Sequence, residues 1–170
     1  MKHLMLTFLS VAVVTVFAGC TQDDPLAESG ANVKAVEELV RQIEDTYGSG
    51  GGVCAELYYE DKPGYLECGV LIDISDLESS VNTNSLASDS GSNKYMLGLG
   101  SFRTTSNAFQ IKTRLAYSLR VVATIEKVTV NNQRWHRVWI GPIDGAKSTI
   151  TLLQAMNDDG IDTIVVKANQ

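Results

Sequence analysis
Two segments of this chain, about 40 residues apart, repeat the same order of strand and helix patterns, and this repeat limits the folds available to it. Residues 95–102 (YMLGLGSF) and 135–143 (WHRVWIGPI) each alternate like a short strand and lead into a glycine-containing turn. Each is followed by an amphipathic stretch of helical period, at residues 106–119 and 146–159, and then by another strand pattern. The repeat predicts an α+β module at the C-terminal end, with a four-stranded antiparallel βαββαβ sheet and two helices on one face.

The two predicted helices each present one apolar stripe that would cover the sheet. Thr104 or Thr105 can cap the start of the first helix, and Gly160 ends the second. The inward positions are Ala108, Ile111, Leu115 and Leu119 in the first helix and Ala146, Ile150, Leu153 and Met156 in the second.

A tight turn at Asn131-Asn132 sets the pairing of the strands predicted over residues 120–130 and 133–140. Asparagine tolerates the positive φ angles of a two-residue hairpin turn. With that turn, the opposite positions are Glu126 and Arg137, Thr124 and Trp139, and Val128 and Trp135. These six side chains share one sheet face, while the helices would cover the other.

The face without helices carries both tryptophans of the chain, Trp135 and Trp139, beside Arg137 and Thr124. Aromatic rings next to hydrogen-bond donors suit carbohydrate, because a ring packs on the C–H face of a sugar while polar groups bind its hydroxyls and amides. The pattern therefore favours a sugar-binding face. The alternative is that the two tryptophans pack against the preceding hairpin segment or the linker.

The first 19 residues have the layout of a secretory signal. Lys2 provides the basic start, an apolar run covers residues 4–17, and small residues follow. The run is shorter than a typical membrane span. We therefore expect residues 1–19 to be a signal peptide that is removed on export.

The signal ends in Phe17-Ala18-Gly19-Cys20, which resembles the lipobox of bacterial lipoproteins, although that family prefers leucine where this chain has Phe17. The resemblance implies diacylation of Cys20, and several acyl chains anchor a protein stably where one chain does not. Lipoproteins of the inner membrane usually carry aspartate after the cysteine, so Thr21 implies the periplasmic face of the outer membrane. An ordinary cleaved signal with an incidental cysteine is the alternative.

Charge divides the rest of the chain into two parts. Residues 21–93 carry 15 acidic and 3 basic side chains, whereas residues 94–170 carry 5 acidic and 10 basic ones. The acidic part contains a predicted helix over residues 32–47, which Asn32 can cap. Its apolar stripe consists of Val33, Val36, Val40, Ile43 and Tyr47. The segment 32–78 that begins with this helix could dock another envelope protein.

Residues 53–74 have the pattern of a β-hairpin around the turn EDKPG, with Cys54 and Cys68 on either side of it. In an exported protein such a pair is expected to form a disulfide, which would contribute on the order of 3 kcal/mol. The spacing is not C-x-x-C, and one histidine remains after the signal, so neither a redox role nor metal binding is expected.

Residues 79–93 (SSVNTNSLASDSGSN) contain almost no large apolar side chain and are expected to be a disordered linker. The predicted organisation is therefore a signal peptide at 1–19, a lipidated tether at 20–31, an acidic helix–hairpin segment at 32–78, the linker at 79–93 and the sheet module at 94–170.

The stretch from residue 95 to residue 167 is similar to the SPOR domain, the sporulation-related repeat that binds peptidoglycan. The first strand of that family tends to end in aromatic-V-Q-x-G-S-F, and residues 97–102 here read LGLGSF. Its third strand ends in R-V-x-V-G-P-F, and residues 137–143 read RVWIGPI. The resemblance implies binding to glycan strands stripped of their stem peptides, often at the septum during cell division. Many family members pair the domain with a membrane anchor and a linker.

One position departs from the family pattern. Gly98 stands where the family has a glutamine that commonly helps to hold the glycan, so the change weakens binding or lets the tryptophans approach the sugar more closely. The residues expected to bind glycan are Trp135, Trp139, Arg137, Thr124, Ser101 and Gly98.

Catalysis is not expected, and no cofactor is implied. A zinc amidase needs several histidine or glutamate ligands, and His136 is the only histidine after the signal. The sequence shows neither the frame of a glycosidase nor a nucleophile elbow. Sheets of this kind also bind RNA, but export excludes that partner. The predicted function is a peptidoglycan-binding lipoprotein of the envelope. The alternative is an accessory of a wall-modifying enzyme or a protein-docking lipoprotein.

Overall fold

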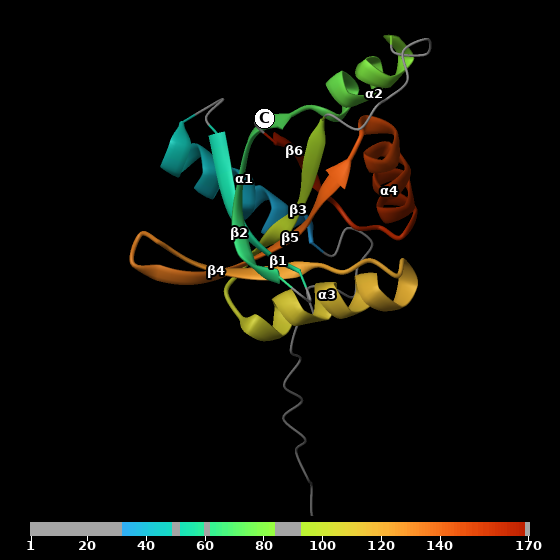
Figure 1. Cartoon of the computed structure of the whole chain (residues 1–170). Helices are drawn as coiled ribbons and strands as arrows, with labels where there is room; N and C mark the ends of the chain where they lie inside the picture. Colours follow the sequence, from blue (N-terminus) through green and yellow to red (C-terminus); the bar gives the residue numbers. More distant parts are fainter. Residues whose placement is uncertain (1–31, 49–51, 60–61, 84–92, 169–170) are drawn as a thin grey trace, which may run out of the picture.

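The computed structural model describes residues 32–48, 52–59, 62–83 and 93–168, and the structural statements below concern these residues. The predicted signal peptide and the tether with Cys20 lie outside them. The described elements (Figure 1) are α1 (Val33–Tyr47), β1 (Gly52–Tyr59), β2 (Lys62–Ile72), α2 (Ile74–Thr83), β3 (Lys94–Phe102), α3 (Thr105–Ser118), β4 (Thr124–Val130), β5 (Gln133–Asp144), α4 (Ala146–Asp158) and β6 (Ile164–Ala168). None of the described helices is long and apolar enough to cross a membrane.

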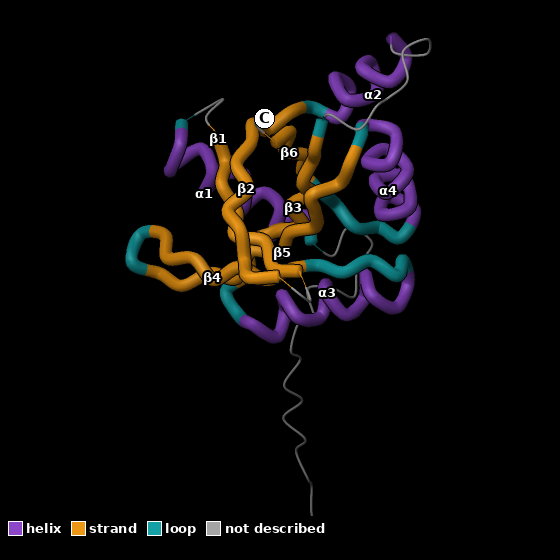
Figure 2. Tube along the Cα trace, in the orientation of Figure 1, coloured by secondary structure: helices purple, strands orange, loops and turns teal. Residues whose placement is uncertain are grey.

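The six strands form one antiparallel sheet in the order β1-β2-β6-β3-β5-β4 (Figure 2). The predicted α+β class is confirmed, and β3 to β6 are the four strands expected in the C-terminal module. The predicted strand number is wrong, because β2 pairs with β6 from Gly69↔Ala168 to Ile72↔Val165. An unpaired β6 would expose backbone donors and acceptors along its edge, and β2 satisfies them. The hairpin therefore extends the sheet instead of standing apart.

The strand–helix–strand unit occurs twice as predicted, in β3-α3-β4 and β5-α4-β6. Thr104 caps α3, since its side chain accepts a hydrogen bond from the Asn107 N–H at 3.3 Å. The apolar stripes predicted for α3 and α4 face the core, and of their members only Leu119 and Ile150 are partly buried. The fully covered members are Ala108, Ile111, Leu115, Ala146, Leu153 and Met156.

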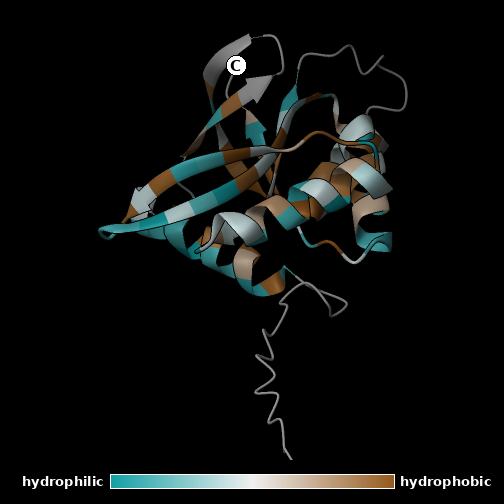
Figure 3. Cartoon of the chain, turned by 90° about the horizontal axis from the view of Figure 1, so that it is seen from below, coloured by the Kyte–Doolittle hydropathy of each residue, from teal (hydrophilic) through white to brown (hydrophobic). Residues whose placement is uncertain are grey.

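The β4–β5 hairpin has the predicted turn and register. Asn131 and Asn132 have φ angles of 50° and 59°. The cross-strand pairs include Glu126↔Arg137, Thr124↔Trp139 and Val128↔Trp135. Strand β4 begins at Thr124 and not at residue 120, because Arg120 has a φ of 58°, which a strand does not adopt. Figure 3 shows that the tip of this hairpin is hydrophilic.

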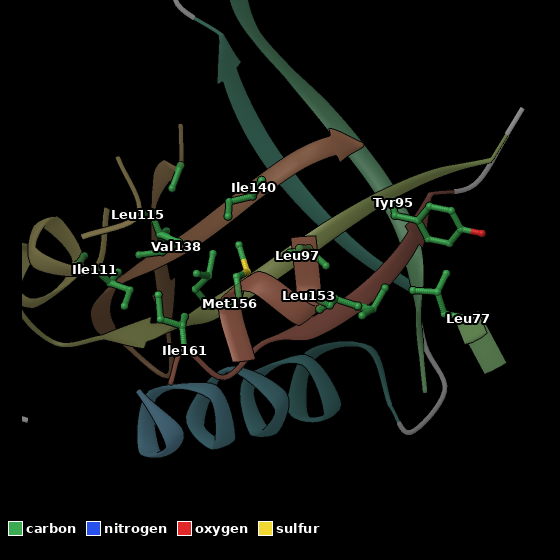
Figure 4. Close-up of a cluster of buried hydrophobic side chains, with 14 of the residues drawn as sticks. Leu77, Tyr95, Leu97, Ile111, Leu115, Val138, Ile140, Leu153, Met156 and Ile161 are labelled. Carbon is green, nitrogen blue, oxygen red and sulfur yellow. The ribbon is translucent and has the colours of Figure 1, made fainter. Parts of the chain in front are cut away.

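The larger hydrophobic core lies between the sheet and helices α3 and α4 (Figure 4). Leu97 and Ile140 come from the neighbouring strands β3 and β5 and are 0% and 5% exposed. Ile111 and Leu115 of α3 and Met156 of α4 pack against this sheet face. The face is thus closed by the helices that the repeat predicted.

Helix α2 corrects the predicted linker. It runs from Ile74 to Thr83 and therefore includes the first five residues of the segment expected to be disordered. Leu77, 1% exposed, joins the larger core, and Val81 packs against it. Burial of Leu77 and Val81 stabilises this otherwise polar helix. The polar composition of the segment gave no indication of a helix. Residues 84–92 of the predicted linker lie outside the described part.

The sheet face predicted to be open is covered by α1 and β1. A second core forms there from Leu39, Ile43, Val53, Ala55, Leu57, Met96, Trp139 and Val166. The predicted α1 stripe is right only in part, because Ile43 is buried and Val36 and Val40 are half-buried, whereas Val33 and Tyr47 are each 41% exposed. The buried positions of α1 are Leu39, Gln42 and Ile43. We call the sheet face under α1 the α1 face.

Candidate functional site
The strand register gathers the predicted glycan-binding residues on the α1 face. Ser101 of β3 lies opposite Arg137 of β5, and Gly98 lies opposite Trp139. A β-bulge between Gly98 and Gly100 changes the alternation of β3, so that Ser101 faces the same side as Gly98. The sequence therefore predicted the grouping of these side chains correctly.

The predicted exposure of this group is wrong. Trp139 is 0% exposed, Trp135 7%, Arg137 4% and Ser101 3%. The physical reason is that α1 and β1 lie over the face and form the second core with the Trp139 ring. For Trp139 this is the alternative raised by the sequence, in which the ring packs against the preceding segment.

The centre of the α1 face holds a buried polar cluster completed by α1. The Gln42 side chain is fully buried, and its Oε1 accepts hydrogen bonds from Ser101 Oγ at 2.9 Å and from Arg137 Nε at 3.2 Å. Its Nε2 donates to Glu38 Oε1 at 2.8 Å. Arg41 in turn binds Glu38, and that hydrogen bond is the main cause that lowers the pKa of the Glu38 carboxyl. A single carboxamide thus satisfies two donors of the sheet.

Glu126 lies opposite Arg137, as predicted, and its side chain connects β4 to β1 through hydrogen bonds. Its Oε2 accepts a hydrogen bond from Trp139 Nε1 at 3.1 Å, and its Oε1 accepts one from the backbone N–H of Glu56 in β1 at 3.2 Å. Burial raises the pKa of the Glu126 carboxyl, and these two hydrogen bonds partly oppose that shift. Burial also lowers the pKa of the Arg137 guanidinium, against the attraction of Glu126. The carboxylate therefore links the two edge strands, β1 and β4.

Trp135 is covered differently from Trp139. The guanidinium carbon of Arg103 lies 3.8 Å from the centre of the Trp135 ring, the geometry of a cation–π contact. Arg103 itself is exposed, and its charge also helps to lower the pKa of Glu38 on α1. An exposed, charged side chain therefore shields this ring at the border of the face.

Two glycines of β3 allow α1 to lie close to the strand. A Cβ at Gly98 would come within 2.8 Å of Leu39 Cδ2 and of Trp139, and a Cβ at Gly100 would come within 2.6 Å of the Ala35 Cβ. Gly100 also has a φ of 135°. Glycines inside a strand often mark the close approach of another segment. Gly98 and Gly100 were therefore the feature of the sequence that could have indicated that α1 packs against β3.

Sequence reasoning missed the α1 residues that complete the site. Asn32 is 1% exposed and does not cap α1; its Nδ2 donates to Leu99 O at 2.8 Å and to Asp162 O at 2.6 Å. Its Oδ1 accepts from the Asp162 N–H at 2.9 Å. Asn32 thus fastens the start of α1 to the sheet module. The partners of Asn32, and the sheet partners of Gln42, are far away in the sequence.

Cys54 and Cys68 are joined by a disulfide with an S–S distance of 2.05 Å. They lie directly opposite each other in β1 and β2. The bond ties together the hairpin whose outer strand, β1, contributes to the second core.

His136 lies away from the α1 face. Its Nε2 is 2.8 Å from Thr105 Oγ1, and its Nδ1 is buried without a hydrogen-bond partner among the described residues. The described residues contain no group of three or more histidine, cysteine, aspartate or glutamate side chains placed to hold a metal ion.

Comparisons with known proteins agree with the strand motifs. Among solved structures, the chain is similar to the SPOR domain of RlpA from Pseudomonas aeruginosa, with 25% sequence identity, a TM-score of 0.40 and coverage of 42% of this chain and 96% of that one. No curated protein matches the chain. The family model for the SPOR domain matches residues 91–167, which include the α1-face residues of β3, β4 and β5 but exclude α1 and the β1–β2 hairpin. Residues 91–167 of this chain therefore belong to the SPOR family, whose domains bind peptidoglycan.

Proposed function
We propose that this chain is a lipid-anchored envelope protein that binds peptidoglycan glycan strands through its SPOR domain. The observation that carries the proposal is the family match over residues 91–167. The ligand is the glycan strand stripped of stem peptides, which is found at the division septum. We place the site on the α1 face, where Trp135 and Trp139 stack on sugar rings and the polar contacts come from Arg137, Thr124 and Ser101.

The clustering of aromatic and donor groups supports this placement. Ser101 and Arg137 are opposite one another, and Thr124 and Trp139 form the neighbouring pair across β4 and β5. A sugar ring on Trp139 would lie within reach of these donors. Gly98, opposite Trp139, carries no side chain of its own, and the space beside it is filled by Leu39 of α1.

Binding is tested by sedimentation with purified sacculi, using residues 21–170. We expect more protein to sediment with amidase-treated sacculi than with untreated ones, because the amidase removes stem peptides. Trp135→Leu should weaken binding roughly tenfold through lost stacking. Tyr117→Leu is the matched control, since Tyr117 is 77% exposed on α3. Failure of the wild-type protein to sediment with amidase-treated sacculi would refute the proposed function.

The anchor at Cys20 is a separate part of the proposal and rests on the Phe17-Ala18-Gly19-Cys20 run. In cells supplied with labelled fatty acid, the wild-type protein should carry label and fractionate with the outer membrane. Cys20→Ala should abolish the labelling, because the thiol that is acylated is absent. Equal labelling of the two proteins would show that Cys20 is not the lipid attachment site.

A further inference from the structure
The α1 face is already occupied by a group with the chemistry of an amino-sugar substituent. The Gln42 carboxamide is buried on this face, and its carbonyl oxygen accepts hydrogen bonds from Ser101 Oγ at 2.9 Å and Arg137 Nε at 3.2 Å. An acetamido group offers the same planar C=O and N–H pair. Ser101 and Arg137 both belong to the SPOR domain, whereas Gln42 comes from the helix outside the family match.

Resting on the proposed function, we propose that α1 is an autoinhibitory lid and that its Gln42 side chain occupies the place of a glycan acetamido group. Leu39 and the acetamido mimic lie over the same strands that carry Trp139 and Arg137. Glycan and α1 therefore cannot occupy the α1 face together. Binding requires α1 to leave, which uncovers Trp139, Met96 and the Ser101–Arg137 pair.

The contacts of α1 are suited to release. Its large, fully covered apolar side chains are Leu39 and Ile43, whereas Val33 and Tyr47 at its two ends are each 41% exposed. The polar path from Gln42 through Glu38 ends at Arg41, whose side chain is 50% exposed. The cover of Trp135 is the exposed Arg103 side chain. Water can therefore replace each polar contact as the helix leaves.

The start of α1 is held to the sheet module by one side chain. Asn32 makes three hydrogen bonds, to Leu99 and Asp162. Loss of the Asn32 contacts should free the helix without altering the polar groups of the α1 face.

Two substitutions test the lid, because apparent affinity falls with the fraction of molecules that are closed. Gln42→Ala leaves Ser101 and Arg137 unpaired in the closed form only, and Asn32→Ala loosens the helix at its start. Each should raise the affinity for amidase-treated sacculi by about tenfold, the effect of losing one or two buried hydrogen bonds from the closed form. Glu44→Ala is the control, since Glu44 is exposed on the same helix.

Tryptophan fluorescence follows opening without ligand, because the only two tryptophans of the chain are Trp135 and Trp139. The two lid variants should show stronger acrylamide quenching and a red-shifted emission, with unchanged far-ultraviolet circular dichroism. Sacculi whose amino sugars have been de-N-acetylated after amidase treatment test the acetamido assignment. Both lid variants should bind these sacculi about tenfold more weakly than acetylated ones, the effect of losing a charge-assisted hydrogen bond.

Each outcome decides the inference. Folded lid variants that bind amidase-treated sacculi no better than wild type overturn the lid, and so does global unfolding of both variants, since the domain could then not stay folded when α1 leaves. Equal binding to acetylated and de-N-acetylated sacculi overturns the Gln42 mimicry. Absence of binding by wild type and variants alike overturns the proposed function itself, which separates that failure from a failure of the lid.

Discussion
Trp139→Ala should destabilise the folded protein by about 3–5 kcal/mol, the usual cost of removing a buried aromatic side chain. Trp139 is 0% exposed and packs in the second core with residues of α1 and β1. The substitution leaves a cavity there and also deprives Glu126 Oε2 of the indole N–H. Urea unfolding of residues 21–170 at fixed pH gives the change in the free energy of unfolding.

Two further variants isolate the causes of this loss. Trp139→Phe keeps an aromatic ring but removes the donor to Glu126, so its cost should be smaller, about 1–3 kcal/mol. Tyr117→Ala removes an aromatic side chain that is 77% exposed and should change stability by less than about 0.5 kcal/mol. If Trp139→Ala is as stable as Tyr117→Ala, α1 and β1 do not cover the ring in solution.

Gly69→Ala should destabilise the protein by about 3 kcal/mol, at the upper end of the range for overpacking. Gly69 lies opposite Ala168 where β2 joins β6. A Cβ there would collide with the backbone carbonyl oxygen of Lys167 and come within 2.7 Å of Val166 Cγ1. Backbone atoms cannot rotate away, so relief requires β2 to separate from β6.

Gly52→Ala is the matched control for this effect. Gly52 lies on the neighbouring strand β1, and a Cβ there would meet the Gly69 carbonyl oxygen at 3.4 Å, an ordinary contact. Its stability should therefore equal or slightly exceed that of wild type, because alanine reduces the entropy of the unfolded chain. Similar urea midpoints for Gly69→Ala and Gly52→Ala would contradict the pairing of the hairpin with β6.

The local part of the SPOR fold was predictable because its signals lie close together in the sequence. The Asn131-Asn132 turn set the register of β4 and β5, and the predicted opposition of Glu126 to Arg137 is observed. The periodicity of α3 and α4 likewise identified their buried faces. Short-range backbone geometry and side-chain alternation decide these features.

The cover of the α1 face was not predictable in this way. The sequence identified a helix over residues 32–47, and the structure has α1 at Val33–Tyr47, but the predicted stripe left out the buried Leu39 and Gln42. The helix turns Gln42 inward because Ser101 and Arg137 offer donors there, and these partners are 59 and 95 residues away. A helix face predicted from the spacing of apolar residues alone places a glutamine such as Gln42 on the solvent side.

The sequence by itself determined the family, the six glycan-site candidates and their common face, because strand register and motif order are local properties of residues 95–167. Only the tertiary structure decided that this face is closed. Its closure depends on the pairing of β2 with β6 and on the space that Gly98 and Gly100 leave for α1. It also depends on the hydrogen bonds of Gln42 with Ser101 and Arg137. Each is a long-range contact whose energy depends on the complementary shape and charge of two surfaces, and no single segment carries that information.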